Sequence, residues 1–213
     1  MFCDILKKTD MLGRPEEWFN LRRVKAYCQV KGIENISFAA YAKDIMRHTT
    51  SSTGVFGVNF HVDQYQSLKK QDIDVFEILK FDKIYYLERG DKISQAYSLA
   101  KARVTDVWSS NVELTPEAEA KVEKIKYSNI LEELVRISRW DAFVAEKILP
   151  KIDGTFRHED VVADKESTCF KVLFSDLNIP FPSDFHAVPE RNRQAKSRDL
   201  QRVVELKRYL MGP

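Results

Sequence analysis

The chain has 213 residues, and its 34 lysines and arginines against 32 aspartates and glutamates leave a formal net charge of +2 with neutral histidines. This balance gives no bulk electrostatic reason to expect a protein that binds nucleic acid or a membrane surface. Hydrophobic residues make up 44% and charged residues 31%, which excludes a disordered chain and suits a globular domain with one substantial core. The 7 glycines and 7 prolines are too few for a many-turned β-sandwich or barrel, so a helix-rich α/β or an all-α fold remains.

The cysteines and histidines give no sign of a metal centre. Cys3, Cys28 and Cys169 lie far apart, so they predict neither a disulfide framework nor a zinc knuckle. The 4 histidines form no HxxxH or HExxH pair, and we expect no metal site. No apolar run approaches the ~20 residues of a membrane span, and the N-terminus does not resemble a signal peptide. We therefore expect a cytoplasmic protein with reduced thiols and no membrane span.

The first half of the chain predicts two helices and two strands. Helical spacing of apolar residues predicts a first helix that the chain already occupies at Met1 and that Gly13 and Pro15 end. A second helix is predicted over residues 37–47. Residues 55–60 and 83–87 are short, β-rich and apolar, which is typical of buried strands.

The second half continues the alternation of strand and helix. The apolar pattern predicts a helix over 93–108, a long helix over 130–148, a strand over 155–162, a helix over 165–177 and a last helix over 197–210. Strand followed by helix, repeated, predicts a parallel sheet with helices on its faces. Because no internal repeat or low-complexity linker is present, we expect a single domain over residues 1–213.

The segment after the strand at 83–87 carries residue types that bind anions. In an open parallel sheet, ligands lie beyond the carboxyl ends of the strands, where helix N-termini supply N–H donors. Arg89 follows the strand, and Ser94 and Ser98 lie one turn apart on one face of the next helix. A guanidinium and hydroxyls that converge there would bind a phosphate. The alternative is that Arg89 pairs with a neighbouring carboxylate on the surface and Ser98 has no ligand.

Three motifs, in order along the chain, carry a family resemblance. The pattern Arg-x-Asp-x-x-Ser-Gln-Ala-x-Ser over residues 89–98 resembles the 3′-phosphate site of bacterial carbohydrate sulfotransferases of the trehalose, nodulation-factor and lipopolysaccharide type. Residues 12–19, Leu-Gly-Arg-Pro-Glu-Glu-Trp-Phe, are similar to the family segment Gly-x-Pro-x-Glu-Phe/Trp-Phe. Residues 53–60, Thr-Gly-Val-Phe-Gly-Val-Asn-Phe, are similar to its strand Asn-Gly-Val-Trp/Phe-Gly-x-Lys. Weaker similarities at 156–161 and 193–195 extend the resemblance over nearly the whole chain.

This resemblance implies a fold and a reaction. The fold is α/β, a P-loop-NTPase-like parallel sheet flanked by helices. The implied enzyme is a PAPS-dependent sulfotransferase, which moves a sulfuryl group from 3′-phosphoadenosine 5′-phosphosulfate to a hydroxyl of a carbohydrate or glycolipid acceptor and releases adenosine 3′,5′-bisphosphate. It implies no metal and no nucleic-acid partner, and a homodimer is compatible with it. The identity of the acceptor would depend on loops such as residues 20–36 and 105–125.

The resemblance also implies roles for individual residues. Glu17 matches the carboxylate expected to act as general base, and burial against the adjacent aromatic rings would raise its pKa. The alternative for Glu17 is a solvated loop carboxylate. The implied donor-binding residues are Arg89, Ser98, Ser94 and Arg193. The implied acceptor-site residues are Arg14, Trp18, Asn59 and His61. For Trp18 and the neighbouring aromatic residues, a place in the core is the competing interpretation.

Two features depart from the family pattern. The family opens with a β-strand and an Arg-Ser-Gly-Ser-Thr-like loop that holds the 5′-phosphosulfate, whereas this chain starts directly after the position of that loop. We expect a start codon assigned too late; the alternative is a non-catalytic remnant or interaction domain that binds nucleotide weakly or not at all. Asn59 stands where the family often has a lysine, which removes one cation from the transition state. A basic stretch over residues 190–208 is interpreted as a solvated helix face or a phosphate contact rather than a nucleic-acid site.

Overall fold

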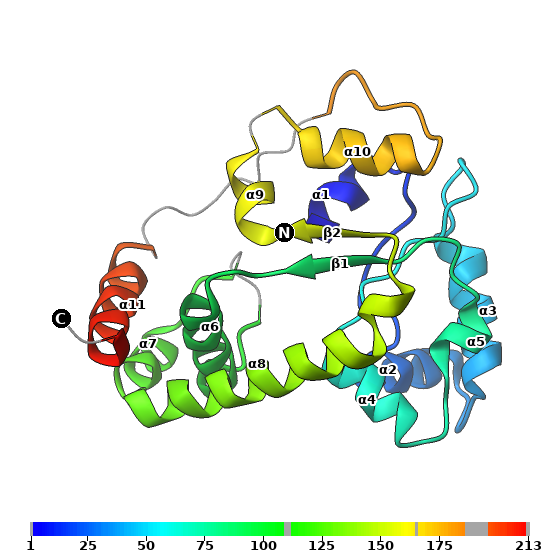
Figure 1. The fold of residues 1–213 in the computed structure, drawn as a ribbon. Coiled ribbons are helices and arrows are strands. Elements are labelled where there is room, and N and C mark those ends of the chain that lie inside the picture. Colours follow the sequence, from blue (N-terminus) through cyan, green and yellow to red (C-terminus); the bar gives the residue numbers. More distant parts are fainter. Residues whose placement is uncertain (1, 109–111, 165, 186–195, 212–213) are drawn as a thin grey trace. The chain divides into compact units, whose positions relative to one another are not determined.

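The computed structural model describes residues 2–108, 112–164, 166–185 and 196–211. Within these ranges the chain forms a helix-rich α/β fold, which confirms the coarse fold class expected from the sequence (Figure 1). The elements are α1 (Phe2–Lys8), α2 (Leu21–Lys31), α3 (Phe38–Thr49), α4 (Val62–Lys69), α5 (Val75–Leu79), β1 (Tyr85–Glu88), α6 (Lys92–Thr105), α7 (Pro116–Glu123), α8 (Tyr127–Lys147), a 3₁₀ turn (Leu149–Lys151), β2 (Gly154–Arg157), α9 (His158–Ala163), α10 (Thr168–Asp176) and α11 (Lys196–Met211).

The strands β1 and β2 pair in parallel and form a two-stranded sheet among the described residues. Just before the strands, the Asp153 N–H donates to the carbonyl of Ile84 at 2.7 Å, and the Ile84 N–H donates to the Asp153 carboxylate at 2.7 Å. These reciprocal bonds set the register. The P-loop-like character of the sheet stays a prediction.

Contacts divide the chain into two compact units. Unit 1 comprises Met1–Tyr85, Ile152–Phe156 and Asp160–Pro189, and unit 2 comprises Tyr86–Lys151, Arg157–Glu159 and Glu190–Pro213. Each strand therefore begins in unit 1 and ends in unit 2. The single-domain organisation expected from the sequence stays a prediction.

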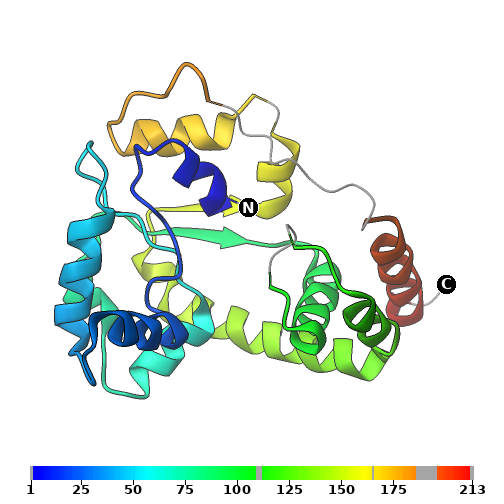
Figure 2. The same cartoon turned by 180° about the vertical axis from the view of Figure 1, so that it is seen from behind.

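The core of unit 1 forms where α1 and α10 pack together, as the views from both sides show (Figure 2). Ile5 and Leu6 of α1 are buried against Phe170 and Phe174 of α10, neither of which is accessible to solvent. The ring of Phe2 stacks on Phe170 with centroids 5.1 Å apart. The burial of these aromatic rings contributes to the hydrophobic stabilisation of the unit.

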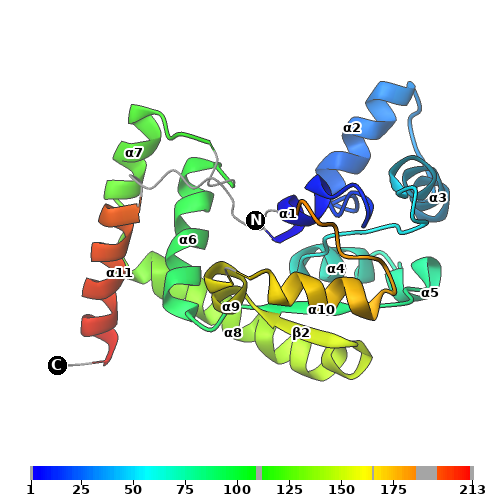
Figure 3. The ribbon, with the colours of Figure 1, turned by 90° about the horizontal axis from the view of Figure 1, so that it is seen from above.

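The core of unit 2 is built on α6, which packs against α7, α8 and α11 (Figure 3). The buried residues of this core are Ala96, Tyr97 and Ala100 of α6, Ile130 and Ile137 of α8, and Val203 and Leu206 of α11. The three small or flat residues of α6 let the neighbouring helices approach closely. The N-terminal end of α6, where the phosphate site was expected, is thereby held on a packed scaffold.

Some predicted elements are shorter than expected. The first helix ends at Lys8, because Asp10 adopts a left-handed conformation with φ 53° and turns the chain before Gly13. The strand expected over 55–60 is wrong: the segment makes one isolated parallel bridge, between Glu16 and Val58. Of the strand expected over 155–162, only the first part is β2, and the remainder is α9.

The two segments expected to be loops each contain a helix. Residues 20–36 contain α2, whose N-terminus is capped by the Asn20 side chain bonding to the Arg22 N–H. Residues 105–125 contain α7, where the Thr115 hydroxyl accepts from the Ala118 N–H and proline occupies the first turn. Both capping residues are visible in the sequence, but α2 has no buried residue and α7 has only Ala118, so no apolar stripe marks either helix.

Candidate functional site

A tight turn at Gly13 brings the motif at residues 12–19 against the motif at residues 53–60. Gly13 has φ +69°, and a Cβ there would lie 2.7 Å from the Val55 carbonyl oxygen and 2.8 Å from the Gly57 nitrogen. Only glycine fits this close approach of two backbones. The bridge between Glu16 and Val58 follows directly, and the Asn59 N–H donates to the Glu16 carbonyl at 3.0 Å. The turn and the bridge therefore place the residues after Glu16 beside those after Val58.

Glu17 lies at the centre of the resulting cluster. Its Oε1 is 3.3 Å from His61 Nε2, and its Oε2 accepts from Gln64 Nε2 at 2.6 Å and from Asn20 Nδ2 at 3.3 Å. The hydrogen bond from His61, followed by those from Asn20 and Gln64, outweighs burial and lowers the pKa of Glu17 to about 2. The side chain is 39% exposed. The expectation that aromatic burial raises this pKa is therefore wrong, because polar donors rather than rings surround the carboxylate.

His61 completes the pair. Its side chain is about half exposed, and the hydrogen bond to Glu17 raises its pKa. The Nδ2 atom of Asn59 lies 3.4 Å from the same Nε2. The structure thus brings together the candidate base Glu17 and two of the candidate acceptor residues, Asn59 and His61.

Trp18 and Arg14 lie on the adjacent turn. The indole Nε1 of Trp18 donates to the Arg14 carbonyl at 2.7 Å, and the guanidinium of Arg23 lies 5.1 Å from the centre of the indole ring. Trp18 is partly buried, while the Arg14 side chain is exposed. Phe19 is a core residue, only 1% exposed, so the core interpretation holds for it and not for Trp18.

Gln64 is a member of this cluster that the sequence analysis missed. It is 8% exposed and holds Glu17 through its amide nitrogen, while its buried Oε1 has no hydrogen-bond partner among the described residues. A buried polar atom without a partner is costly, so this oxygen can receive a donor from a ligand. Its position three residues after His61, on the same helical face of α4, was the available signal.

The candidate donor residues belong to unit 2. Arg89 follows β1 and is partly buried. Asp91 caps α6: its side chain accepts from the Ser94 N–H at 3.0 Å and from the Ser94 hydroxyl at 2.7 Å. Ser98 is exposed one turn later. Arg89 thus precedes the start of α6 and Ser98 lies within the helix, whereas the Ser94 hydroxyl already donates to Asp91.

The carboxylates on either side of Arg89 in the sequence each form an ion pair. Asp91 pairs with Lys207 at 2.8 Å, and Glu88 lies 3.7 Å from Arg157. Although burial raises the pKa of Asp91, the hydrogen bonds from Lys207 and Ser94 lower it to about 2. Arg193, the remaining candidate, lies outside the described residues.

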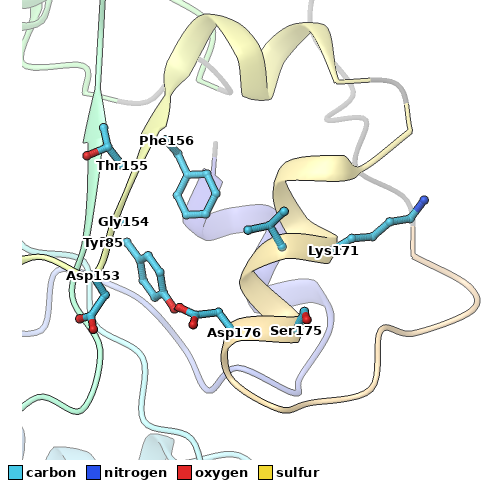
Figure 4. Close-up of a pocket in the computed structure, with 9 residues that line it drawn as sticks. Tyr85, Asp153, Gly154, Thr155, Phe156, Lys171, Ser175 and Asp176 are labelled. Carbon is cyan, nitrogen blue, oxygen red and sulfur yellow. The ribbon is translucent and has the colours of Figure 1, made fainter.

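A separate cavity of about 620 Å³ opens in unit 1 between β2 and α10 (Figure 4). Tyr85 points across it and its hydroxyl donates to Asp176, with Lys171 and Ser175 on the same helix. None of the site residues expected from the sequence lines it. This cavity is therefore not the site that the motifs describe.

Comparisons with known proteins agree with the motifs. Residues 1–139 match the model of a family described as Stf0 sulphotransferase. A search of curated proteins gave no match.

Within the described ranges, no group of three or more histidine, cysteine, aspartate or glutamate side chains could hold a metal ion. No helix described here has both the length and the apolarity needed to cross a membrane.

Proposed function

The chain belongs to the Stf0 sulphotransferase family, and from this premise we propose that it transfers a sulfuryl group from 3′-phosphoadenosine 5′-phosphosulfate to a hydroxyl of a carbohydrate or glycolipid. The observation that carries the proposal is the family match over residues 1–139, which include every candidate site residue except Arg193. The free state of Cys3, Cys28 and Cys169 is compatible with a reaction in the cytoplasm.

In this reaction the acceptor oxygen forms a bond to sulfur while the bond from sulfur to the 5′-phosphate oxygen breaks. The acceptor proton passes to a base, and adenosine 3′,5′-bisphosphate leaves with the electron pair of the broken bond. The enzyme must hold both substrates in line and remove the proton. We assign proton removal to Glu17 and binding of the 3′-phosphate to Arg89 and Ser98, with Ser94 and Arg193 as further donor ligands.

The Glu17 cluster suits an acceptor hydroxyl. Glu17 is ionised at neutral pH and partly exposed, so a proton can reach it. The buried Oε1 of Gln64 can accept a hydrogen bond from a second hydroxyl of the same sugar. One face of Trp18 can stack on a sugar ring. When an acceptor replaces the His61 contact, Glu17 loses the contact that lowers its pKa most and becomes a better base.

A specific observation favours a second assignment of the base within the same reaction. His61 is about half exposed, and its Nε2 contacts the Glu17 carboxylate. Glu17 would therefore orient the imidazole ring, while Nδ1, the other ring nitrogen, takes the proton of the acceptor. The pH dependence of kcat/KM distinguishes Glu17 from His61 as the base. With Glu17 as base, activity stays flat as pH falls from 8 to about 5. With His61 as base, activity falls as pH drops through its raised pKa.

The test of the function uses a radiolabelled donor and a panel of sugars and glycolipids. We expect label transfer by the wild type, and a decrease of about 100-fold or more in Glu17→Gln. Glu16→Gln is the matched control, because Glu16 is the adjacent carboxylate and pairs with Lys7 and Arg23 instead. Equal losses in both variants would overturn the role of Glu17. No transfer to any acceptor, together with no binding of bisphosphate, would favour the non-catalytic alternative.

A further inference from the structure

The loop from Arg89 to Asp91 is held by a carboxylate that is distant in sequence. Glu159 Oε2 accepts from the Gly90 N–H at 3.1 Å, and its Oε1 accepts from the Asp91 N–H at 3.0 Å. Although burial raises the pKa of Glu159, these two backbone hydrogen bonds lower it to about 2. A carboxylate that spans two successive N–H groups fixes the course of the chain between β1 and α6.

The side chains of Arg157 and Glu159 pack against the loop at Gly90. A Cβ at Gly90 would lie 2.8 Å from Arg157 Nη2 and 3.5 Å from Glu159 Oε2. A side chain at position 90 would therefore require the Arg157 guanidinium to move. Arg89, the residue before Gly90, lies in the same loop.

A second contact comes from the C-terminal helix. Lys207 of α11 lies 2.8 Å from Asp91 Oδ2, the same oxygen that accepts from the Ser94 hydroxyl. Asp199 anchors α11 by accepting from Lys101 Nζ at 2.7 Å and from the Tyr97 hydroxyl at 3.1 Å. Without Lys207, Asp91 would present an uncompensated negative charge at the start of α6, where a phosphate has to bind.

We propose that Glu159 and Lys207 are positioning residues for the 3′-phosphate of the donor. Glu159 fixes the loop that carries Arg89, and Lys207 neutralises Asp91 and keeps Ser94 oriented. Neither residue touches the phosphate itself. The inference rests on the proposed function, and both residues lie outside the range 1–139 that the family model matches.

Calorimetric titration with adenosine 3′,5′-bisphosphate tests the effect on binding. We expect Glu159→Gln and Lys207→Met each to weaken binding about tenfold, because each loses one charge-assisted contact to the loop. Asp160→Asn is the control for the first, since Asp160 is the exposed neighbour of Glu159. Lys101→Met is the control for the second, because Lys101 also joins α6 to α11 through an ion pair of 2.7 Å. Lys207→Arg should restore most of the affinity.

Two outcomes separate failure of this inference from failure of the function. If the wild type binds, and Glu159→Gln and Lys207→Met bind as tightly as the wild type, the positioning role is overturned while the function stands. If the wild type binds no bisphosphate, the proposed function is overturned, and so is the role of Glu159 and Lys207 in positioning the phosphate site.

A ligand-free measurement tests the contact itself. Amide hydrogen exchange at Gly90 and Asp91 should be faster in Glu159→Gln than in the wild type and unchanged in Asp160→Asn. Unchanged exchange at both amides in Glu159→Gln would overturn the positioning role, whatever the protein binds.

Discussion

Glu17 and His61 stabilise each other in their charged forms. The hydrogen bond from His61 lowers the pKa of Glu17 to about 2, and the same bond raises the pKa of His61. Each pKa shift raises the free energy of unfolding, because the charged form is favoured more in the folded protein than in the unfolded chain. Both side chains are more than a third exposed, so solvent screens the pair and its contribution is small.

The pair predicts a specific pH window. The Glu17 contribution to stability is present above pH 4.5 and is lost as pH falls towards 2, whereas the His61 contribution is present below pH 6.5 and is lost as pH rises through its raised pKa. The difference in free energy of unfolding between wild type and Glu17→Gln should therefore be largest between pH 4.5 and 6.5. Denaturant titrations measure it, with the exposed Glu146→Gln as control. A difference that does not change with pH would contradict the pairing.

Gly13 and Gly32 offer a matched pair of substitutions. Both have positive φ, +69° and +64°, but a Cβ at Gly13 meets the backbone of residues 55 and 57, whereas a Cβ at Gly32 meets nothing within 4 Å. Gly32→Ala should cost about 1 kcal/mol, the penalty of the left-handed conformation alone. Gly13→Ala should cost at least about 2 kcal/mol, because the backbone must also move apart. Equal losses in denaturant unfolding would show that the two segments do not approach closely.

At the scale of elements, burial on α8 decides what a substitution costs. Ile137 is 2% exposed in the core shared with α6 and α11, while Val135 on the same helix is 52% exposed. Ile137→Ala should lower the free energy of unfolding by about 2–5 kcal/mol, and Val135→Ala by less than about 0.5 kcal/mol. Thermal or denaturant unfolding measures both. A small loss at Ile137 would mean that α8 does not pack as described.

Long amphipathic helices with a cap could be predicted from the sequence, and short or exposed ones could not. The helices α3, α6, α8 and α10 show an apolar stripe because one face of each is buried. Helix α2 has no buried residue, so no stripe marks it, and α5 has only 5 residues. The segment 55–60 has strand composition but finds a single bridge, because pairing depends on a partner that the segment itself does not specify.

Only part of the candidate site, too, could be predicted from the sequence. The motifs identified Glu17, Asn59 and His61, and the structure brings these three side chains together. The direction of the Glu17 pKa shift could not be predicted, since it depends first on the contact with His61 and then on those with Asn20 and Gln64, and no local pattern shows that these side chains reach the carboxylate. The partners of the Arg89 loop come from residues 68 or more positions away, which no local pattern reveals.

At the scale of the whole molecule, the residues proposed for proton removal and those proposed for donor binding belong to different units. The Glu17 cluster belongs to unit 1, and Arg89, Ser94 and Ser98 belong to unit 2. The family match over residues 1–139 covers the first segment of unit 1 and most of the first segment of unit 2, so both sets of residues lie within the matched range. We therefore expect Glu17→Gln to lower turnover with bisphosphate affinity nearly unchanged, and Arg89→Ala to weaken that affinity. Turnover assays and calorimetry on the same preparations check the division, and the reverse pattern would show that the roles are assigned wrongly.

The most direct test of the proposed function is a calorimetric titration of the wild type and Arg89→Ala with adenosine 3′,5′-bisphosphate, the product of the donor. Adenosine 2′,5′-bisphosphate serves as the control ligand, because it carries the same charges with one phosphate misplaced. The account predicts saturable heat with the 3′,5′ isomer, weaker binding of the 2′,5′ isomer, and a loss of about tenfold or more in Arg89→Ala. No heat with the wild type, or equal affinity of Arg89→Ala for the 3′,5′ isomer, would contradict it.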